Sequence, residues 1–396
     1  MEKVIRYLDN SATTKPSDAA LRGIDEALAA WGNPSSVHCI GQNGAALLRE
    51  CRKKVAKTCG MPAVTRDRLI FTSCGTESNA IALLGCAHSK RRDREHPGTV
   101  IISAGEHPSV DLCAVSLENE GYALVRVPTV GGVLDLDYLR SAVENADSPV
   151  VAAAFMLVNN ETGAVYDVKS AARIVKSKYP DALVHCDAVQ GYMKLRFTPY
   201  TLGVDTLTVS AHKIHSIRGA GALFISEETV KRKNIVPVMP GGGQEAGYRS
   251  GTENTVAISA FAAAADDANA HFSENRTKVE SLRTYLDSSL AERCPTVRQT
   301  RPAGEFLPNI CSLVVPGIRS ETMLNFLSGR GICVSAGSAC AANAKKKSAA
   351  LDAFGVSPDD ADSTLRVSLS YMNTTDDIDA LTAGLADGIA SLQKKR

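Results

Sequence analysis

The chain has 396 residues, of which 44% are hydrophobic and 22% are charged, and its formal net charge is +1. This composition is typical of a globular protein large enough for two domains, and so small a net charge excludes a strongly basic surface for nucleic acid or membranes. The 11 cysteines include no C-x-x-C pair, and the sequence has neither a signal-peptide pattern nor a charge-free stretch of transmembrane length. We therefore expect a cytoplasmic protein with no disulfide framework, no membrane segment and no direct nucleic-acid partner.

Short apolar runs alternate with helical segments along the first two thirds of the chain. The runs predict buried strands at Leu69–Thr72, Val100–Ser103, Ala123–Val127, Val150–Leu157, Ala182–His185, Thr206–Ser210 and Ala222–Ser226. Helical spacing of apolar residues lies between several of them, as in Ser78–Lys90 and Val168–Lys178. The alternation predicts an α/β fold with a mostly parallel, seven-stranded sheet, in which ligands bind at the carboxyl ends of the strands.

The pattern changes after about residue 255. One long helical stretch, from Thr255 to about Glu292, leads into two further strand-like runs at Asn309–Val315 and Leu365–Leu369. We therefore expect a large domain of residues 15–255 and a smaller α/β domain of residues 1–14 and 256–396.

Lys213 ends the motif Ser210-Ala-His-Lys, which directly follows a predicted strand. Its amine is a candidate for a Schiff base with pyridoxal 5′-phosphate (PLP), and Ser210 and His212 are candidates for holding the phosphate. Asp187, at the end of the preceding strand, offers the carboxylate that pairs with a protonated pyridine nitrogen. The alternative for Lys213 is a solvated lysine at a strand end.

A glycine turn between a strand and a helix predicts a phosphate site at Gly75 and Thr76, because the first N–H groups of a helix and its dipole attract anions. Thr252 is a further phosphate candidate in the Gly-rich loop 241–254, which lacks the G-x-G-x-x-G spacing of a dinucleotide site. Two more side chains follow strands. His107 is either a catalytic residue that stacks on a flat cofactor ring and shuttles protons, or a structural histidine. Asn160 either binds a phenolic oxygen or forms a turn.

Cys340 lies in a loop of small residues, and Lys345–Lys347 follow it. A helix start and nearby positive charges both lower a thiol pKa, so Cys340 is a candidate nucleophile, with a structural cysteine as the alternative. Arg366, on a predicted strand, suits an amino-acid carboxylate or a structural ion pair. His212 and His215 have no third ligand at a recognisable spacing, so we expect no metal site.

Taken in order, these motifs resemble the cysteine desulfurases, PLP enzymes of the class V aminotransferases with the fold type I architecture. The resemblance runs nearly end to end and includes Tyr7–Thr14, Asn33–Ser36, Thr72–Ser78, Glu106-His107, Asn159–Gly163, His185–Gln190, Ser210–Lys213, Arg249–Thr252, Ser335–Cys340 and Leu365-Arg366. The Ser-x-Gly-Ser-Ala-Cys loop resembles the group that supplies sulfur for iron–sulfur clusters and tRNA thiolation.

The resemblance implies that L-cysteine is converted to L-alanine while its sulfur becomes a persulfide on Cys340. It implies that Lys213 forms the Schiff base and removes the α-proton, that His107 stacks on the cofactor ring, and that Asp187 pairs with the ring nitrogen. The remaining implied ligands are Asn160 and Gln190 for the phenolic oxygen, Gly75, Thr76, Ser210 and His212 for the phosphate, and Arg366 with Asn160 for the substrate. Thr252 would reach the phosphate from the other subunit of a homodimer. The implied partner is a sulfur acceptor, such as an iron–sulfur scaffold or a tRNA-thiolation enzyme.

Two positions depart from the family pattern. Cys74 stands where the family often has a glycine or another small residue, and it either packs or offers a second thiol near the cofactor. Ala246 replaces a common arginine in the loop before Arg249. Three other functions fit parts of the sequence: a selenocysteine lyase, a PLP aminotransferase on the same fold, and an inactive scaffold that only docks sulfur-relay partners.

Overall fold

Seven strands form the central sheet of the computed structural model, which describes residues 4–61, 65–90, 97–336 and 348–393. They are β2 (Leu69–Thr72), β3 (Thr99–Ser103), β4 (Ala123–Val127), β7 (Val150–Met156), β8 (Leu183–Asp187), β9 (Thr206–Ser210) and β10 (Gly221–Ile225). Their order is β2-β10-β9-β8-β7-β3-β4, and only β10 runs antiparallel to its neighbours. The prediction of a mostly parallel, seven-stranded sheet is confirmed.

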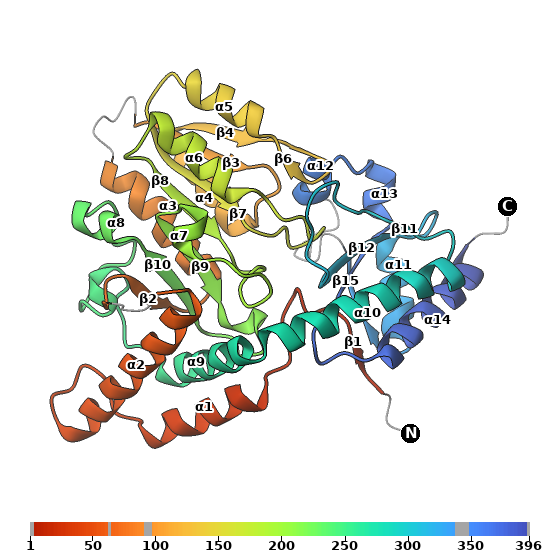
Figure 1. Cartoon of the computed structure of the whole chain (residues 1–396), viewed down its shortest axis with the longest axis horizontal. Coiled ribbons are helices and arrows are strands. Elements are labelled where there is room, and N and C mark those ends of the chain that lie inside the picture. Colours follow the sequence, from red (N-terminus) through yellow and green to blue (C-terminus); the bar gives the residue numbers. More distant parts are fainter. Residues whose placement is uncertain (1–3, 62–64, 91–96, 337–347, 394–396) are drawn as a thin grey trace.

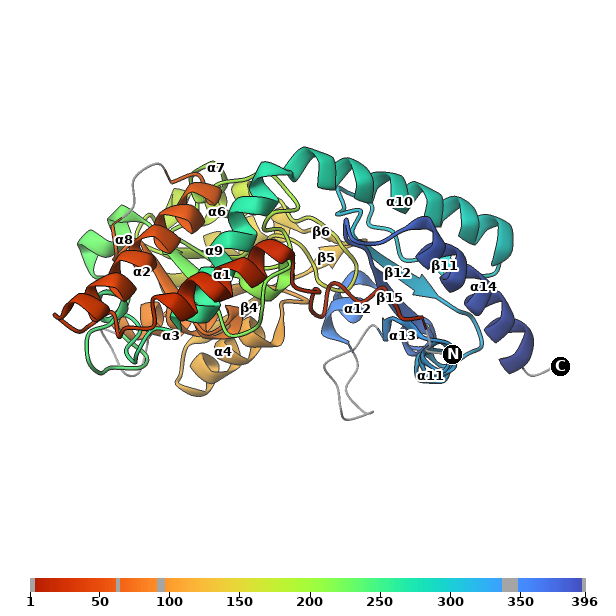
Figure 2. The same cartoon turned by 90° about the horizontal axis from the view of Figure 1, so that it is seen from below.

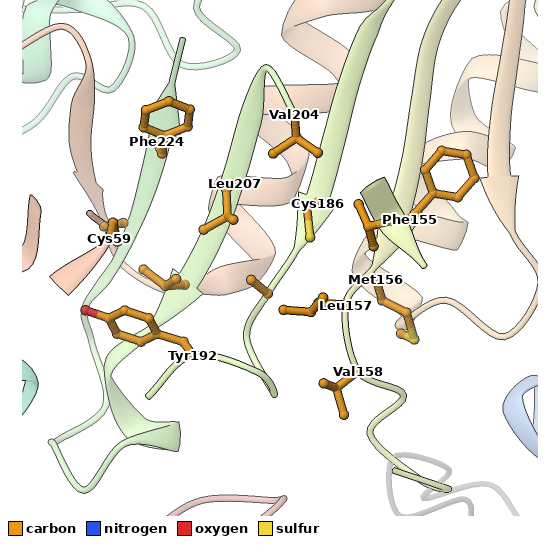
Figure 3. Close-up of a cluster of buried hydrophobic side chains, with 14 of the residues drawn as sticks. Cys59, Phe155, Met156, Leu157, Val158, Cys186, Tyr192, Val204, Leu207 and Phe224 are labelled. Carbon is orange, nitrogen blue, oxygen red and sulfur yellow. The ribbon is translucent and has the colours of Figure 1, made fainter. Parts of the chain in front are cut away.

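Both faces of this sheet are buried under helices. On one face, Ile70, Ile102 and Leu223 pack with α3 (Gly75–Lys90) and α4 (Pro108–Asn119). On the other face, Phe155 and Phe224 belong to a larger cluster of buried side chains (Figure 3). Residues of α5 (Leu136–Glu144), α6 (Val168–Lys178) and α9 (Thr255–Ala270) belong to the same cluster. Burial on both faces explains why the strands are continuous apolar runs in the sequence.

The strand directions bring the ends of six strands to one edge of the sheet. Because β2 and β9 are both antiparallel to β10, β2 runs parallel to the rest of the sheet. The carboxyl ends of β2, β3, β4, β7, β8 and β9 therefore lie at the same edge, which is where the predicted site residues follow their strands.

The remaining elements of this part are α1 (Asp18–Ala29), α2 (Cys39–Thr58), the hairpin β5 (Thr129–Val130) and β6 (Val133–Leu134), α7 (Pro199–Leu202) and α8 (Glu227–Arg232). The helices α1 and α2 pack on the alanine-rich α9. The α1–α9 contact is close, because a Cβ atom added at Gly23 would lie 2.7 Å from the backbone oxygen of Ser259. Within the described ranges, no helix is both long and apolar enough to cross a bilayer.

A second sheet and core form the C-terminal part of the fold. Its elements are α10 (Phe272–Arg293), β11 (Arg298–Gln299), β12 (Ile310–Val314), α11 (Ser320–Ser328), β13 (Ile332–Cys333), β14 (Ser335–Ala336), α12 (Ala349–Phe354), α13 (Pro358–Asp362), β15 (Thr364–Ser368) and α14 (Thr375–Leu392). The four-stranded sheet has the order β11-β12-β15-β14, and α10 and α14 lie side by side next to it (Figures 1 and 2).

The expected single helix from Thr255 to about Glu292 is two helices that meet at His271. They belong to different cores: α9 packs under the large sheet, whereas Leu282 and Leu286 of α10 pack in the C-terminal core. The domain limits at residues 15 and 255 stay a prediction. The packing leads us to propose that α9 belongs with the large domain.

The N-terminal segment connects the two parts. Strand β1 (Arg6–Tyr7) pairs in parallel with β13, Leu8 is buried in the C-terminal core, and the Asn10 side chain donates a 2.8 Å hydrogen bond to the Ser368 carbonyl. A few residues later the chain reaches the large sheet, where the N–H of Thr14 donates to the His212 carbonyl at 2.9 Å.

A buried ion pair fixes the loop that carries Thr252. Arg52 of α2 makes two 2.7 Å hydrogen bonds to Glu245, which lies in the short 3-10 turn η2 (Glu245–Gly247). Glu245 also accepts a 2.8 Å bond from the Phe71 N–H, so the turn is fastened to the outer strand β2. The side chains of Arg52 and Glu245 are only 7% and 1% exposed.

Removing one partner of this pair should destabilise the fold strongly. Arg52→Met leaves the Glu245 carboxylate buried without its counter-ion, and we expect the free energy of unfolding to fall by about 3–5 kcal/mol. Urea unfolding measures it. Arg140→Met, which removes the exposed pair with Asp137 on α5, is the control and should cause little change. Equal losses in the two variants would contradict the prediction.

Candidate active site

Lys213 lies at the carboxyl edge of the large sheet, in the 3-10 turn η1 (Ala211–Lys213) that directly follows β9. Its amine donates hydrogen bonds to the carbonyls of Ser11 and Ala12, the second at 2.8 Å. The Ser11 carbonyl also accepts a 3.0 Å bond from the amide nitrogen of Gln190. The N-terminal segment therefore brings Lys213 and Gln190 to one point.

Gln190 is oriented by a second lysine that the sequence did not single out. The Lys194 amine donates to the Gln190 side-chain oxygen at 3.2 Å, which leaves the amide nitrogen directed towards Ser11. Burial, and then the charge of Lys213, lower the pKa of Lys194 to about 7.

The predicted phosphate ligands lie around the start of α3, and several of them fit an anion. The Ser210 hydroxyl is buried and has no hydrogen-bond partner among the described residues, although a buried hydroxyl normally has one. A Cβ atom at Gly75 would lie 2.9 Å from a methyl group of Val189, so a larger residue would press on that side chain at the start of α3. Burial, and then the charge of Lys213, lower the pKa of His212 to about 4, so a donor on its ring is neutral at pH 7. These residues fit the phosphate of PLP.

Asp187 ends β8 and is only 7% exposed. One carboxylate oxygen accepts a 3.0 Å bond from the Val189 N–H, and the other accepts a 2.8 Å bond from the Asn79 amide. These two bonds compensate for part of the hydration that the carboxylate loses, and they fix its orientation. A buried carboxylate in this position fits the ring nitrogen of PLP.

His107 caps the N-terminus of α4, and its Nδ1 atom lies 2.8 Å from the Ser109 hydroxyl and 3.2 Å from the Ser109 N–H. Burial lowers its pKa, while the carboxylate of Asp187 raises it and the charge of Lys213 lowers it. His107, Asp187 and Lys213 all lie at one edge of the sheet, because each is at or shortly after the carboxyl end of a parallel strand.

Glu106, next to His107, is a buried carboxyl group that the sequence gave no role. One of its oxygens accepts hydrogen bonds from the Ser103 hydroxyl and, at 2.6 Å, from the Met156 N–H. The other oxygen has no partner among the described residues. Burial, with a smaller contribution from the charge of Asp187, raises the pKa of Glu106 to about 8, so this side chain is mainly a neutral acid at pH 7.

Arg366 projects from β15 and is 4% exposed. Its two terminal nitrogens bond to the Asn160 carbonyl at 3.0 Å and to the Asp9 carboxylate at 2.9 Å, and its Nε atom has no partner among the described residues. The guanidinium is therefore held in place by two elements and keeps an unused donor. Asp9, in the motif Tyr7–Thr14, was not among the predicted site residues.

Cys340 lies outside the described residues, as do Lys345–Lys347. The flanking residues are placed: Ser335 pairs with Arg366 across β14 and β15, and the Ser348 hydroxyl donates a 2.6 Å bond to Glu161, which follows Asn160. Both ends of the segment that contains Cys340 are thus fixed next to Arg366 and Asn160.

Thr76 and Thr252 are both exposed. The loop of Thr252 approaches the start of α3 within the same chain, where Arg249 forms a 2.9 Å ion pair with Glu77. Ala246 adopts a left-handed backbone, with φ 57°, in the turn that the buried Arg52–Glu245 pair fixes. Cys74 is partly buried beside this region, and its sulfur accepts from the Ser73 hydroxyl at 3.7 Å.

His185 is fully buried in β8, and its Nε2 atom lies 3.0 Å from the side-chain oxygen of Asn79. Sequence reasoning missed Asn79, Ser109, His185, Lys194, Glu106 and Asp9. Two of them carried a usable signal in the sequence: His185 lies within an apolar strand, and Glu106 precedes a candidate catalytic histidine. Buried polar side chains in such places need polar partners. Asn79 lies in an ordinary helix start, so its contact with Asp187, 108 residues away, has no local signature.

The chain matches the model of the Aminotransferase class-V family over residues 6–381. It is 35% identical to a NifS/IcsS protein homolog of Lactobacillus delbrueckii subsp. bulgaricus over 95% of each chain. It is 31% identical to the cysteine desulfurase NifS of Azotobacter vinelandii over 98% of this chain and 93% of that one. A solved structure of a NifS-like protein superposes with a TM-score of 0.88 at 33% identity and covers 98% of this chain and 100% of that chain.

The raised pKa of Glu106 predicts a pH dependence of stability. Between about pH 4.5 and 8 the unfolded chain releases this proton while the folded chain keeps it, so stability falls as the pH rises through this window. Glu106→Gln keeps a neutral group of the same shape and should remove a slope of up to about 1.4 kcal/mol per pH unit. Urea unfolding at pH 5, 6.5 and 8 measures it.

Glu118→Gln, on the exposed side of α4, is the matched control and should keep the slope of the wild type. The same pH dependence in Glu106→Gln and wild type would show that Glu106 is ionised in the folded protein.

Proposed function

Because the chain belongs to the aminotransferase class-V family, among the relatives of the cysteine desulfurase NifS, we propose that it removes sulfur from L-cysteine. The other product is L-alanine, and the sulfur becomes a persulfide on the Cys340 thiol. One observation supports this proposal most directly. Before Cys340, Ser335 pairs with Arg366, and after it, Ser348 bonds to Glu161, the neighbour of Asn160. Arg366 and Asn160 are themselves bonded, at the sheet edge that holds Lys213.

The cofactor of this family is PLP. Lys213 would hold it covalently, Gly75, Thr76, Ser210 and His212 would bind its phosphate, Asp187 would pair with its ring nitrogen, and Asn160 and Gln190 would contact its phenolic oxygen. His107 would stack on its ring. When bound, PLP supplies an electron sink for the charge that develops at the substrate α-carbon.

Lys213 is the base in this proposal. Its Nζ atom takes the α-proton, which requires a neutral amine when substrate is bound. The carbonyls of Ser11 and Ala12 hold the amine in position until then.

Arg366 is the carboxylate ligand in this proposal. Its Nη atoms already contact Asp9 and the Asn160 carbonyl, which restricts the guanidinium to one orientation, and its buried Nε atom has no partner among the described residues. The negative charge of Asp9 offsets the positive charge of Arg366. A bound carboxylate would therefore be recognised by hydrogen-bond donors in fixed positions more than by a net positive charge.

Cys340 is the nucleophile in this proposal. Its sulfur attacks the sulfur of the substrate, the carbon–sulfur bond breaks, and the α-amino acid leaves as alanine with the proton that it gains at Cβ. A hydroxyl in the same place cannot form the sulfur–sulfur bond. The persulfide then passes to an acceptor protein, such as an iron–sulfur scaffold or a tRNA-thiolation enzyme.

The active unit in this proposal is a homodimer in the cytoplasm. The exposed hydroxyl of Thr252 would complete the phosphate site of the partner subunit. The Arg52–Glu245 pair and the Arg249–Glu77 pair hold the loop of Thr252 in one conformation, which suits a contact that must be made across an interface.

Lys213→Ala should abolish covalent attachment of the cofactor. Wild-type protein should be yellow, and borohydride should fix the reduced cofactor to Lys213, as peptide mass spectrometry can locate. The variant should lose this adduct, and alanine release should fall by about 10³-fold, because both the attachment point and the base are gone. An adduct on the neighbouring Lys194 instead would contradict the assignment.

Cys340→Ser should separate cofactor binding from sulfur transfer. The variant should bind PLP and change colour with cysteine, because Lys213 and the pocket are intact, but it should form no persulfide and release almost no alanine. Mass spectrometry of the cysteine-treated protein and an alanine assay measure this. Cys74→Ser and Cys333→Ser are the matched controls and should transfer sulfur as the wild type does. Normal turnover by Cys340→Ser, with loss of turnover in Cys74→Ser, would reassign the nucleophile.

A further inference from the structure

Asn79 is the centre of a buried hydrogen-bond network that the proposed roles leave unexplained. It lies in the first turns of α3, and only 1% of it is exposed. Its amide nitrogen bonds to Asp187 at 2.8 Å and to the Ser109 hydroxyl at 2.9 Å, and its oxygen bonds to Nε2 of His185 at 3.0 Å. The network therefore joins β8, α3 and α4 behind the sheet edge.

The direction of each bond follows from the number of hydrogens. The amide nitrogen of Asn79 has two hydrogens, and Asp187 and Ser109 use both. The opposite amide orientation would place an oxygen against the Asp187 carboxylate, where no hydrogen is available. The Asn79 oxygen must therefore accept from His185.

His185 consequently carries its proton on Nε2. Its Nδ1 atom is then an acceptor, and it lies 2.9 Å from the Thr206 hydroxyl, which has a hydrogen to donate. Burial lowers the pKa of His185 to about 4, so the ring is neutral at pH 7. A neutral ring with one donor and one acceptor satisfies both of its contacts.

The other branch of the network ends at His107. Because the Ser109 hydroxyl accepts from Asn79, its own hydrogen is free for Nδ1 of His107, 2.8 Å away. The Ser109 N–H approaches the same nitrogen at 3.2 Å. An atom that accepts two hydrogen bonds cannot carry a proton, so the proton of neutral His107 must be on Nε2.

We propose that Asn79 is a positioning residue of the active site: through Ser109 it fixes His107 as the Nε2–H tautomer, and through its second hydrogen it orients the Asp187 carboxylate. One side-chain amide thus fixes both the orientation of the Asp187 carboxylate, which would face the cofactor, and the position of the proton on the His107 ring. The inference rests on the proposed function for its consequence in catalysis, but the hydrogen-bond directions are independent of any reaction.

The test reads the tautomers directly. Protein labelled with ¹⁵N-histidine and loaded with PLP is examined by long-range ¹H–¹⁵N correlation at pH 7, and the signals among its 8 histidines are assigned with His107→Gln and His185→Gln. The expected result is that both rings are neutral with the proton on Nε2. A wild-type His107 with its proton on Nδ1 overturns the proposal, whatever any variant does.

Asn79→Asp tests the role of the amide itself. The new side chain has the same shape, but the single proton that it would share with the adjacent Asp187 carboxyl leaves it no hydrogen for Ser109, so the Ser109 hydroxyl should turn towards it and His107 should lose its neutral Nε2–H signal. Asn254→Asp, at the exposed cap of α9 where the side chain only accepts, is the matched control and should leave the signal unchanged. An unchanged His107 signal in Asn79→Asp also overturns the proposal.

The catalytic consequence has its own readout. Because Asn79 acts through His107 and Asp187, Asn79→Asp should lower kcat for alanine release by about tenfold or more while KM for cysteine stays nearly constant. A change confined to KM would contradict a positioning role. If even the wild type releases no alanine from cysteine, the proposed function fails, while the tautomer measurement still decides the network.

Discussion

Burying the Asp187 carboxylate in the middle of the sheet edge is unfavourable, and many neighbouring features compensate for it. A carboxylate that loses its water needs donors, which the Val189 N–H and the Asn79 amide provide. Two buried titratable residues near Asp187 adapt: burial lowers the pKa of His185 to about 4, and burial together with the Asp187 charge raises the pKa of Glu106 to about 8. The fold thereby holds one oriented carboxyl group at the position where a protonated ring nitrogen would complete it.

Much of the large domain could be predicted because its determinants are local. Strands such as β8 and β9 are continuous apolar runs, and parallel strands necessarily end at one edge, so residues that follow them, such as Lys213 and Asp187, meet there. The order of the motifs was enough to indicate the family. The break at His271 was not predictable, because α9 and α10 carry uninterrupted helical sequences and separate only by packing in different cores.

The polar partners of the site could not be predicted, because they depend on contacts between distant segments. Asn79 meets Asp187 and His185 across 108 and 106 residues, and nothing in its own neighbourhood in the sequence distinguishes it from other residues in a first helical turn. The ligands of the Lys213 amine are backbone carbonyls, which every residue has. Side-chain type can therefore indicate which residues do the chemistry, but the groups that orient them emerge only from the fold.

The attachment of the N-terminal segment to β15 has a consequence for folding during synthesis. Asn10 bonds to Ser368, 358 residues further along the chain, and the next two residues hold the Lys213 amine. At about 5–20 residues per second, a ribosome needs roughly 20–70 s to cover that distance. During this time the large sheet can fold, but the first residues have no β15 to bind, and contacts of such long separation form late in any case. The contacts that hold the Lys213 amine can therefore be fixed only after β15 has been synthesised, which would place cofactor loading after that point.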